Sequence, residues 1–159
     1  MNSYRFHVRW GNGGPGDYTG DMTHDGTFTP LQPAGWAVPK GYANGVAAEG
    51  RLVFVAGQIG WNGQGVFESD DFVAQTRQAL ENVVAVLAVA GATPAQITRL
   101  TWYITDKRAY LAAQREIGRV YREVIGPHYP AMTLVQVPAL LEDRALVEIE
   151  ATAVIPRER

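Results

Sequence analysis

The sequence predicts an α+β fold in which a mixed β-sheet carries two helices on one face. Three observations support this. Short apolar or alternating segments at 51–58, 97–105, 132–137 and 145–155 are typical of strands, and two longer segments repeat apolar residues at helical spacing. Strands and helices alternate only in the middle of the chain, and strand pairs close each end, which favours a mixed sheet over a doubly wound one.

The N-terminal part differs in composition from the rest. Ten Gly and Pro residues fall between positions 11 and 35, too many for regular structure. We therefore expect residues 1–39 to form an extended or disordered arm and residues 40–159 to form the folded domain. Residues 11–16 match Gly-x-Gly-x-x-Gly, but no helical pattern follows, which excludes a dinucleotide-binding turn. Met22 begins a more compact version of the protein, so we hypothesise that residues 1–21 precede the native start.

The folded domain is expected to open with a β-hairpin. Residues 44–48 form a short candidate strand, and residues 51–58 form a buried one. Glu49 and Gly50 lie between them as the turn.

Two amphipathic helices are predicted, over residues 70–90 and from about 107 to 125. The first has Ser69 or Asp70 as its N-cap and Gly91 just beyond its end. Both helices cover the same face of the sheet. Because the other face is rich in apolar residues and uncovered, we expect copies of the chain to associate through it.

Composition excludes several classes of partner. The chain has 14 Lys and Arg against 16 Asp and Glu, a net charge of −2, which offers no basic surface for nucleic acid. Its longest apolar-rich stretch, residues 83–92, is far shorter than the roughly 20 residues that span a bilayer. Its first residues do not show the basic and then apolar pattern that is typical of a signal peptide. We expect a cytoplasmic protein with neither nucleic-acid nor membrane partners.

Residue counts also limit the chemistry. The 159 residues include no Cys, and neither of the two Ser lies in a nucleophile elbow. The three His show no metal-ligand spacing, so we expect no metal and no cofactor. Any catalysis would use carboxylates, backbone groups and bound water.

Two glutamates share one face of the last predicted strand. Side chains alternate along a strand, so Glu148 and Glu150 lie about 7 Å apart, opposite the apolar Val147 and Ile149. One interpretation is that an apolar setting tunes such a carboxylate to hold or activate a water. The other is that both glutamates form a solvated face or pair with an arginine such as Arg99.

Five segments together resemble the RidA (YjgF) family of enamine and imine deaminases. They are Gly41-Tyr-Ala-Asn-Gly-Val46, Leu52-Val-Phe-Val-Ala-Gly-Gln-Ile59, Gln75-Thr-Arg-Gln-Ala-Leu-Glu-Asn82, Tyr129-Pro-Ala131 and Val147-Glu-Ile-Glu-Ala151. The resemblance spans about residues 40–156. It implies a chorismate-mutase-like fold, a homotrimer, ligand clefts between subunits, and hydrolysis of reactive enamines or imines to a keto acid and ammonia.

The resemblance also implies the site residues. Glu148 matches the glutamate that positions the attacking water, and Tyr42 matches a pocket tyrosine. Backbone groups from Gly57 to Gly60 would assist the water.

The sequence departs from the family pattern at three positions. Met132 replaces the arginine that binds the substrate carboxylate, Ala56 replaces a serine, and Leu134 replaces a small polarisable residue. With Trp61 in the adjacent loop, the predicted substrate-binding pocket is more apolar than in the deaminase members.

Two functions therefore remain open. The first is hydrolysis of a small imine or enamine with altered specificity. The second is a non-catalytic trimer that binds a metabolite or regulates a partner through the same cleft, with Met132 filling a closed pocket.

Overall fold

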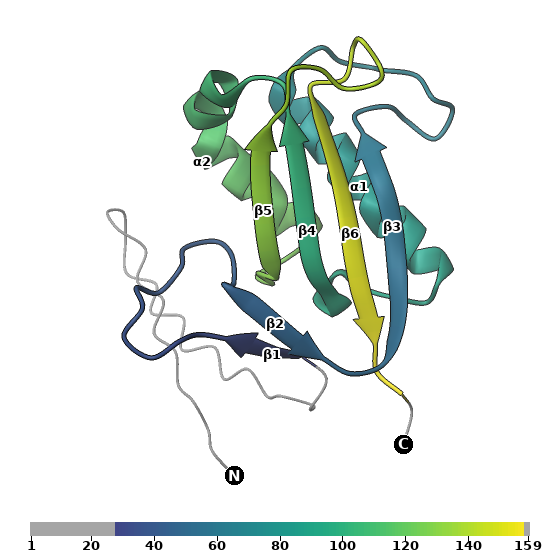
Figure 1. The fold of residues 1–159 in the computed structure, drawn as a ribbon. Helices are drawn as coiled ribbons and strands as arrows, with labels where there is room; N and C mark the ends of the chain where they lie inside the picture. The colour runs from purple at the N-terminus through teal and green to yellow at the C-terminus, as the bar shows by residue number, and fades with distance from the viewer. Residues whose placement is uncertain (1–27, 158–159) are drawn as a thin grey trace.

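The computed structural model describes residues 28–157, which form a four-stranded sheet with two helices on one face and a separate two-stranded ribbon (Figure 1). In chain order the elements are β1 (Phe28–Leu31), β2 (Gly45–Ala48), β3 (Arg51–Ile59), α1 (Phe72–Val89), a 3₁₀ turn (Pro94–Gln96), β4 (Ile97–Ile104), α2 (Lys107–Val124), β5 (Ala131–Gln136) and β6 (Val147–Ile155). The glycine-rich match at 11–16 and the hypothesis about residues 1–21 lie outside the described residues.

The main sheet has the order β3-β6-β4-β5. Strand β6 runs antiparallel to both β3 and β4, and β5 runs parallel to β4. The parallel pair follows from the connection through α2, because a helix can return the chain to the starting edge of the sheet. The predicted mixed sheet with two helices on one face is confirmed.

Both helices begin at an aspartate that caps the backbone. Asp71 accepts a hydrogen bond from the Ala74 N–H (2.8 Å) and is the N-cap of α1. The prediction of Ser69 or Asp70 as the N-cap is therefore wrong. At the other end, Gly91 has a φ of 73°, as expected for a residue just beyond a helix. Asp106 caps α2 in the same way, accepting from Arg108 and Ala109.

The core lies between the helices and the covered face of the sheet. Leu80 and Val83 of α1 meet Leu100 of β4 and Ile149 of β6, and all four side chains are fully buried. Along β6 the residues Val147, Ile149, Ala151 and Ala153 are buried, whereas Glu148, Glu150 and Thr152 between them are half-buried. The predicted alternation along the last strand is confirmed.

Neither strand pair predicted at the ends of the domain forms. At the C-terminal end β5 pairs with β4, and β4 separates it from β6. The predicted N-terminal hairpin is also wrong. Strand β2 pairs with β1, in the register Phe28 with Ala48, and among the described strands β3 pairs only with β6. Gly50, at the predicted turn, lies against the end of β6, where an added Cβ would be 2.1 Å from the Ile155 carbonyl oxygen. Its φ of 151° also favours glycine.

Strand β1 also lies inside the arm for which no regular structure was expected. It includes Pro30, which cannot donate a backbone hydrogen bond. A two-stranded ribbon has only edge strands, and an edge tolerates that loss.

Candidate functional site

Glu148 lies on the face of the sheet that the helices leave uncovered. Its register partners are Ile59 of β3 on one side and Tyr103 of β4 on the other. The side chain is half-buried, while its neighbours Val147 and Ile149 point into the core. A carboxylate is therefore held on a rigid strand with apolar packing directly behind it.

The Glu148 carboxylate occupies the space above Gly57. The pairing of β3 with β6 is irregular between Val55 and Gln58, which marks a bulge at Ala56 and Gly57. A Cβ at Gly57 would collide with the Oε1 atom of Glu148. The structure thus brings together three predicted site residues, Ala56, Gly57 and Glu148. Glycine is required at position 57 because the Glu148 carboxylate approaches its backbone so closely.

The Glu148 carboxylate has no hydrogen-bond or ion-pair partner within residues 28–157. Glu150, two residues on, receives a long hydrogen bond from the Tyr103 hydroxyl (3.4 Å). Neither glutamate forms the expected ion pair with Arg99 in this part of the chain. The acceptor positions of Glu148 are available to a water or a ligand.

Met132 and Leu134 lie on the other side of the sheet. They pair in register with Leu100 and Trp102 of β4, whose side chains are buried in the core, and they pack against the same cluster. Because side chains alternate along a strand, the neighbouring Thr133 is the residue that faces the open side. A single chain therefore does not bring these two predicted residues to Glu148.

Tyr42 is also remote from Glu148. The next residue, Ala43, donates a backbone hydrogen bond to Pro130 (2.9 Å) and forms a bridge with Ala131 at the start of β5. The sheet register places Ala131 level with Arg99, one end of β4, whereas Glu148 lies level with Tyr103 at the other end. Tyr42 and Glu148 belong to opposite ends of the sheet.

The loop after β3 is well organised around Trp61. The Asn82 side chain of α1 donates to the carbonyls of Ile59 (3.0 Å) and Trp61 (2.8 Å). Trp61 also bridges to Phe67, with ring centroids 6.1 Å apart. Trp61 and Gly60 thus form a fixed wall next to the bulge at Gly57.

Sequence reasoning missed Gln75, a buried polar residue on the sheet-facing side of α1. It is 1% exposed, and its side-chain amide bonds to the backbone at Ser69, Arg144 and Leu146. The sequence offered one signal, because Gln75 directly precedes Thr76 on the predicted apolar face of the helix. A glutamine buried on such a face must find hydrogen-bond partners for its amide.

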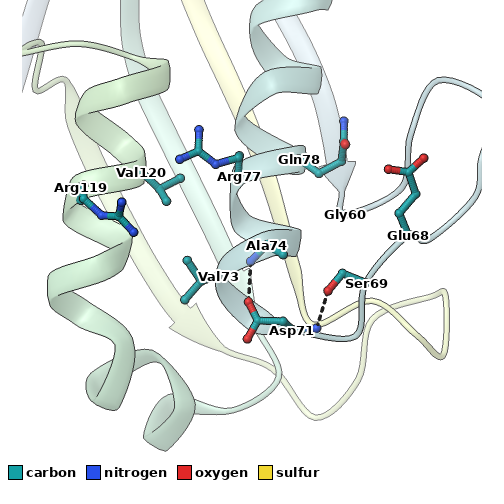
Figure 2. A pocket seen from close by; sticks show the side chains of 10 residues that line it. All are labelled: Gly60, Glu68, Ser69, Asp71, Val73, Ala74, Arg77, Gln78, Arg119 and Val120. Carbon is teal, nitrogen blue, oxygen red and sulfur yellow. Dashed lines mark hydrogen bonds between the residues drawn. The ribbon is translucent and has the colours of Figure 1, made fainter.

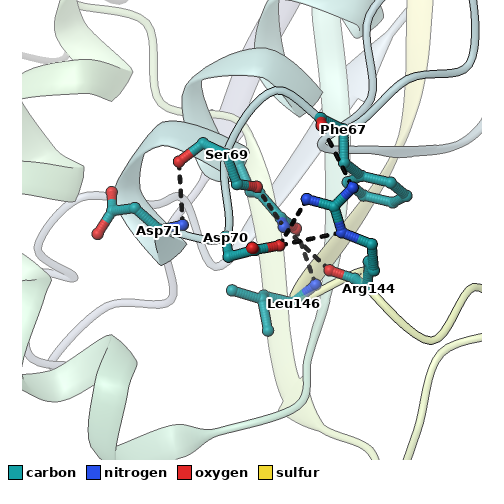
Figure 3. Close-up of polar contacts among 7 residues, drawn as sticks. Phe67, Ser69, Asp70, Asp71, Arg144 and Leu146 are labelled. Atoms are coloured by element: carbon teal, nitrogen blue, oxygen red, sulfur yellow. Dashed lines mark hydrogen bonds and ion pairs between the residues drawn. The ribbon is translucent and has the colours of Figure 1, made fainter.

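Arg144 is held away from Glu148. Its guanidinium binds the Asp70 carboxylate through two nitrogens (3.0 and 2.7 Å) and lies over the Phe67 ring, 5.3 Å from its centroid (Figure 3). It also donates weakly to the Phe67 carbonyl (3.4 Å). This arginine is fully engaged within its own chain.

A pocket of about 360 Å³ opens on the helix side of the molecule, between α1, α2 and the loop before α1 (Figure 2). Of the predicted site residues it includes only Gly60. Its arginines already have partners, because Arg77 binds Glu123 and Glu81, and Arg119 lies 3.7 Å from Glu123. The Arg77 guanidinium also lowers the pKa of Glu123. Both arginines of this pocket are paired within the chain, so we do not assign it as the site.

Burial shifts the pKa of two side chains near the end of α2. Burial raises the pKa of Tyr121, and burial lowers the pKa of His128 against an opposing hydrogen bond to the Ile97 carbonyl. Among residues 28–157 there is no cluster of three potential metal ligands. No helix in that part of the chain is long and apolar enough to cross a membrane.

Comparison with known proteins bears on the family. Residues 36–155 match the family model described as Endoribonuclease L-PSP. A solved structure from Yersinia pestis, described as a protein of unknown function of the conserved Rid protein family, is 34% identical, covers 81% of this chain and 99% of its own, and superposes with a TM-score of 0.71. The chain belongs to the RidA/YjgF family.

Other RidA/YjgF relatives agree. A RutC family protein of Haemophilus influenzae is 41% identical over 105 residues, which cover 66% of this chain and 80% of that protein. The structure of Escherichia coli TdcF with bound serine is 36% identical, covers 75% of this chain and 91% of its own, and has a TM-score of 0.58. The resemblance identified from the five segments is confirmed.

Proposed function

We propose that this RidA/YjgF protein is a cytoplasmic homotrimer that hydrolyses a small imine or enamine in a cleft between subunits. The observation that carries the proposal is the Glu148 carboxylate, held against Gly57 with no partner in the described part of the chain. A water bound there would be positioned and deprotonated without a covalent nucleophile.

Both protons of the attacking water must reach the nitrogen. Glu148 would accept one proton from the water as the water oxygen attacks the carbon of the C=N bond, and would return it to nitrogen to give a carbinolamine. Glu148 would then take the hydroxyl proton of the carbinolamine and pass it to the amino nitrogen as the C–N bond breaks, which releases a carbonyl compound and ammonia. The overall reaction consumes one imine and one water.

An intersubunit site is supported by the separation of the predicted residues. Glu148, Gly57 and Trp61 lie toward one end of the sheet, and Tyr42 lies at the other. A second copy could supply the missing end. The uncovered face also exposes large apolar side chains, with Leu52 57% and Phe54 74% exposed, which a neighbouring subunit would bury.

Substrate charge is expected to differ from that of carboxylate-binding family members. Met132 packs toward the core, and Arg144 is bound to Asp70. A substrate carboxylate buried without a cationic partner would cost several kcal/mol. We therefore propose a neutral or bulky substrate.

The second candidate is a trimer that binds a metabolite without turnover. It is favoured by Met132, which is half-buried against the core where the family has an arginine. The relative TdcF was solved with bound serine, which supports small-metabolite binding as a family capacity. The family description names an endoribonuclease, but a net charge of −2 disfavours RNA as the substrate.

The test is ammonia release from a panel of imines. The panel contains 2-imino acids generated in situ by an amino-acid oxidase, and uncharged imines. We expect acceleration of the uncharged imines, and we expect Glu148→Gln to lower it at least about a hundredfold. The matched control is Glu150→Gln, on the same face of the same strand, which should retain most activity.

Each other outcome has a defined meaning. Acceleration of 2-imino acid hydrolysis would show that the protein recognises a substrate carboxylate although it has Met132 at the position of the arginine. No acceleration by the wild-type protein would favour the binding module. Light scattering of the purified protein tests the trimer independently.

A further inference from the structure

The buried Gln75 side chain on α1 is hydrogen-bonded to the backbone of two loops. Its Nε2 donates to the carbonyls of Ser69 (3.0 Å) and Arg144 (2.9 Å), and its Oε1 accepts from the Leu146 N–H (2.9 Å). Both amide donors and the carbonyl are therefore used, in a side chain that is 1% exposed. Backbone groups of two loops are paired through this one amide.

The same side chain also contacts the end of β3. Gly60 directly follows β3, and a Cβ there would lie 2.5 Å from the Cβ and Cγ atoms of Gln75. Leu146 directly precedes β6. Gln75 thus contacts the residue after one strand and the residue before its antiparallel neighbour.

These two points flank the position of the Glu148 carboxylate. Ile59, adjacent to Gly60, is the register partner of Glu148. Glu148 in turn lies two residues after Leu146. Loss of the amide would leave the Leu146 N–H and two carbonyls without partners, and these groups would move toward water. Such a shift would change the alignment of β3 with β6 where the carboxylate meets Gly57.

We propose that Gln75 is a positioning residue for Glu148, fixing the β3–β6 register so that the carboxylate stays over Gly57. This inference rests on the proposed function for its effect on turnover. Its structural part concerns only the place of the carboxylate.

The primary test compares Gln75→Met with Gln114→Met. Gln114 lies on α2 and is exposed, so it controls for the same chemical change away from the site. At a temperature where both variants are folded, we expect Gln75→Met to lower kcat about tenfold to a hundredfold with KM little changed. Amide exchange at Leu146 should rise about tenfold in Gln75→Met, and neither change should occur in Gln114→Met.

A second variant separates positioning from bulk stability. In Gln75→Glu, a protonated carboxyl keeps one donor and one acceptor, whereas the ionised form faces two carbonyl oxygens. The kcat of Gln75→Glu relative to wild type should therefore rise as pH falls. The ratio for Gln75→Met should stay flat. A merely structural role would lower the melting temperature without this pH-dependent recovery of kcat.

The proposal and the proposed function can fail separately. If wild-type protein hydrolyses no imine, the function fails, and the NMR signal of the Glu148 carboxyl carbon then decides the positioning role. That signal should shift in Gln75→Met and stay in place in Gln114→Met. Unchanged exchange at Leu146 together with an unshifted Glu148 signal overturns the proposal. If Gln75→Met does not fold, the pH series on Gln75→Glu decides by the same signals.

Discussion

The two faces of the sheet differ although the same strands build them. On β6, Val147 and Ile149 are fully buried against the helices, while Glu148 and Glu150 are half-buried on the open face. The covered face is held by packing, where every lost methylene reduces stability. The open face leaves polar groups for a ligand or a second copy. We therefore expect substitutions on the covered face to change stability, and those on the open face to change function.

The largest effect on stability is expected at Ile149. Replacement by alanine should lower the free energy of unfolding by about 2–5 kcal/mol, because the side chain is 0% exposed and a cavity would remain. Urea denaturation followed by circular dichroism measures this. Thr152→Ala, on the open side of the same strand, should cost less than about 1 kcal/mol. Equal losses in the two variants would contradict the difference between the faces.

The next effect is expected at Gly57, where a side chain enters the open face. Gly57→Ala should displace the Glu148 carboxylate and lower imine turnover at least about tenfold, since a misplaced base reacts poorly. The free energy of unfolding should fall by about 1–3 kcal/mol through overpacking. Gly63→Ala is the control, because a Cβ at Gly63 meets nothing within 4 Å. Full activity in Gly57→Ala would show that the carboxylate need not lie over the bulge.

Local sequence patterns predicted the helices and strands, but they did not predict which strands pair. Period-two alternation was enough to place Val147 and Glu148 on opposite faces, because neighbouring side chains of a strand always diverge. The N-terminal hairpin failed because its signals concern only the segments on either side of Glu49 and Gly50, whereas β2 pairs with β1, in which Phe28 lies 20 positions before its partner Ala48. No local rule ranks those competing partners.

The candidate site shows the same division. The sequence selected Glu148 through its strand pattern and family resemblance, and the structure adds that its carboxylate lies over Gly57. The orientation of Met132 depends on its parallel register with Leu100, which the sequence of one strand does not contain. Gln75 was missed because its partner Leu146 is 71 residues away.

Acid should lower the stability of the folded protein through protonation of His128. Its ring donates to the Ile97 carbonyl (2.6 Å) and packs on Phe28 of β1, with ring centroids 4.8 Å apart. Burial lowers its pKa below the usual value of about 6.5, so the unfolded chain binds the proton more readily. The stability contributed by neutral His128 is complete above about pH 6.5 and is lost as pH falls toward the folded-state pKa.

Thermal unfolding between pH 7.5 and 5 tests this prediction, with both values chosen to span the usual histidine pKa of about 6.5. The melting temperature of wild type should fall toward pH 5, and His128→Gln should show a smaller change. If the two curves are parallel, His128 does not carry the pH dependence.

The smallest effect is expected at Arg144. Its ion pair with Asp70 is solvent-exposed, so Arg144→Ala should change the free energy of unfolding by less than about 1 kcal/mol. The substitution leaves the Arg144 carbonyl in place, and the hydrogen bond from Gln75 therefore remains. Kinetics with charged and uncharged imines should give unchanged KM values for both. A tenfold rise in KM confined to 2-imino acids would instead show that Arg144 leaves Asp70 to bind the substrate carboxylate, and that it supplies the cation that Met132 lacks.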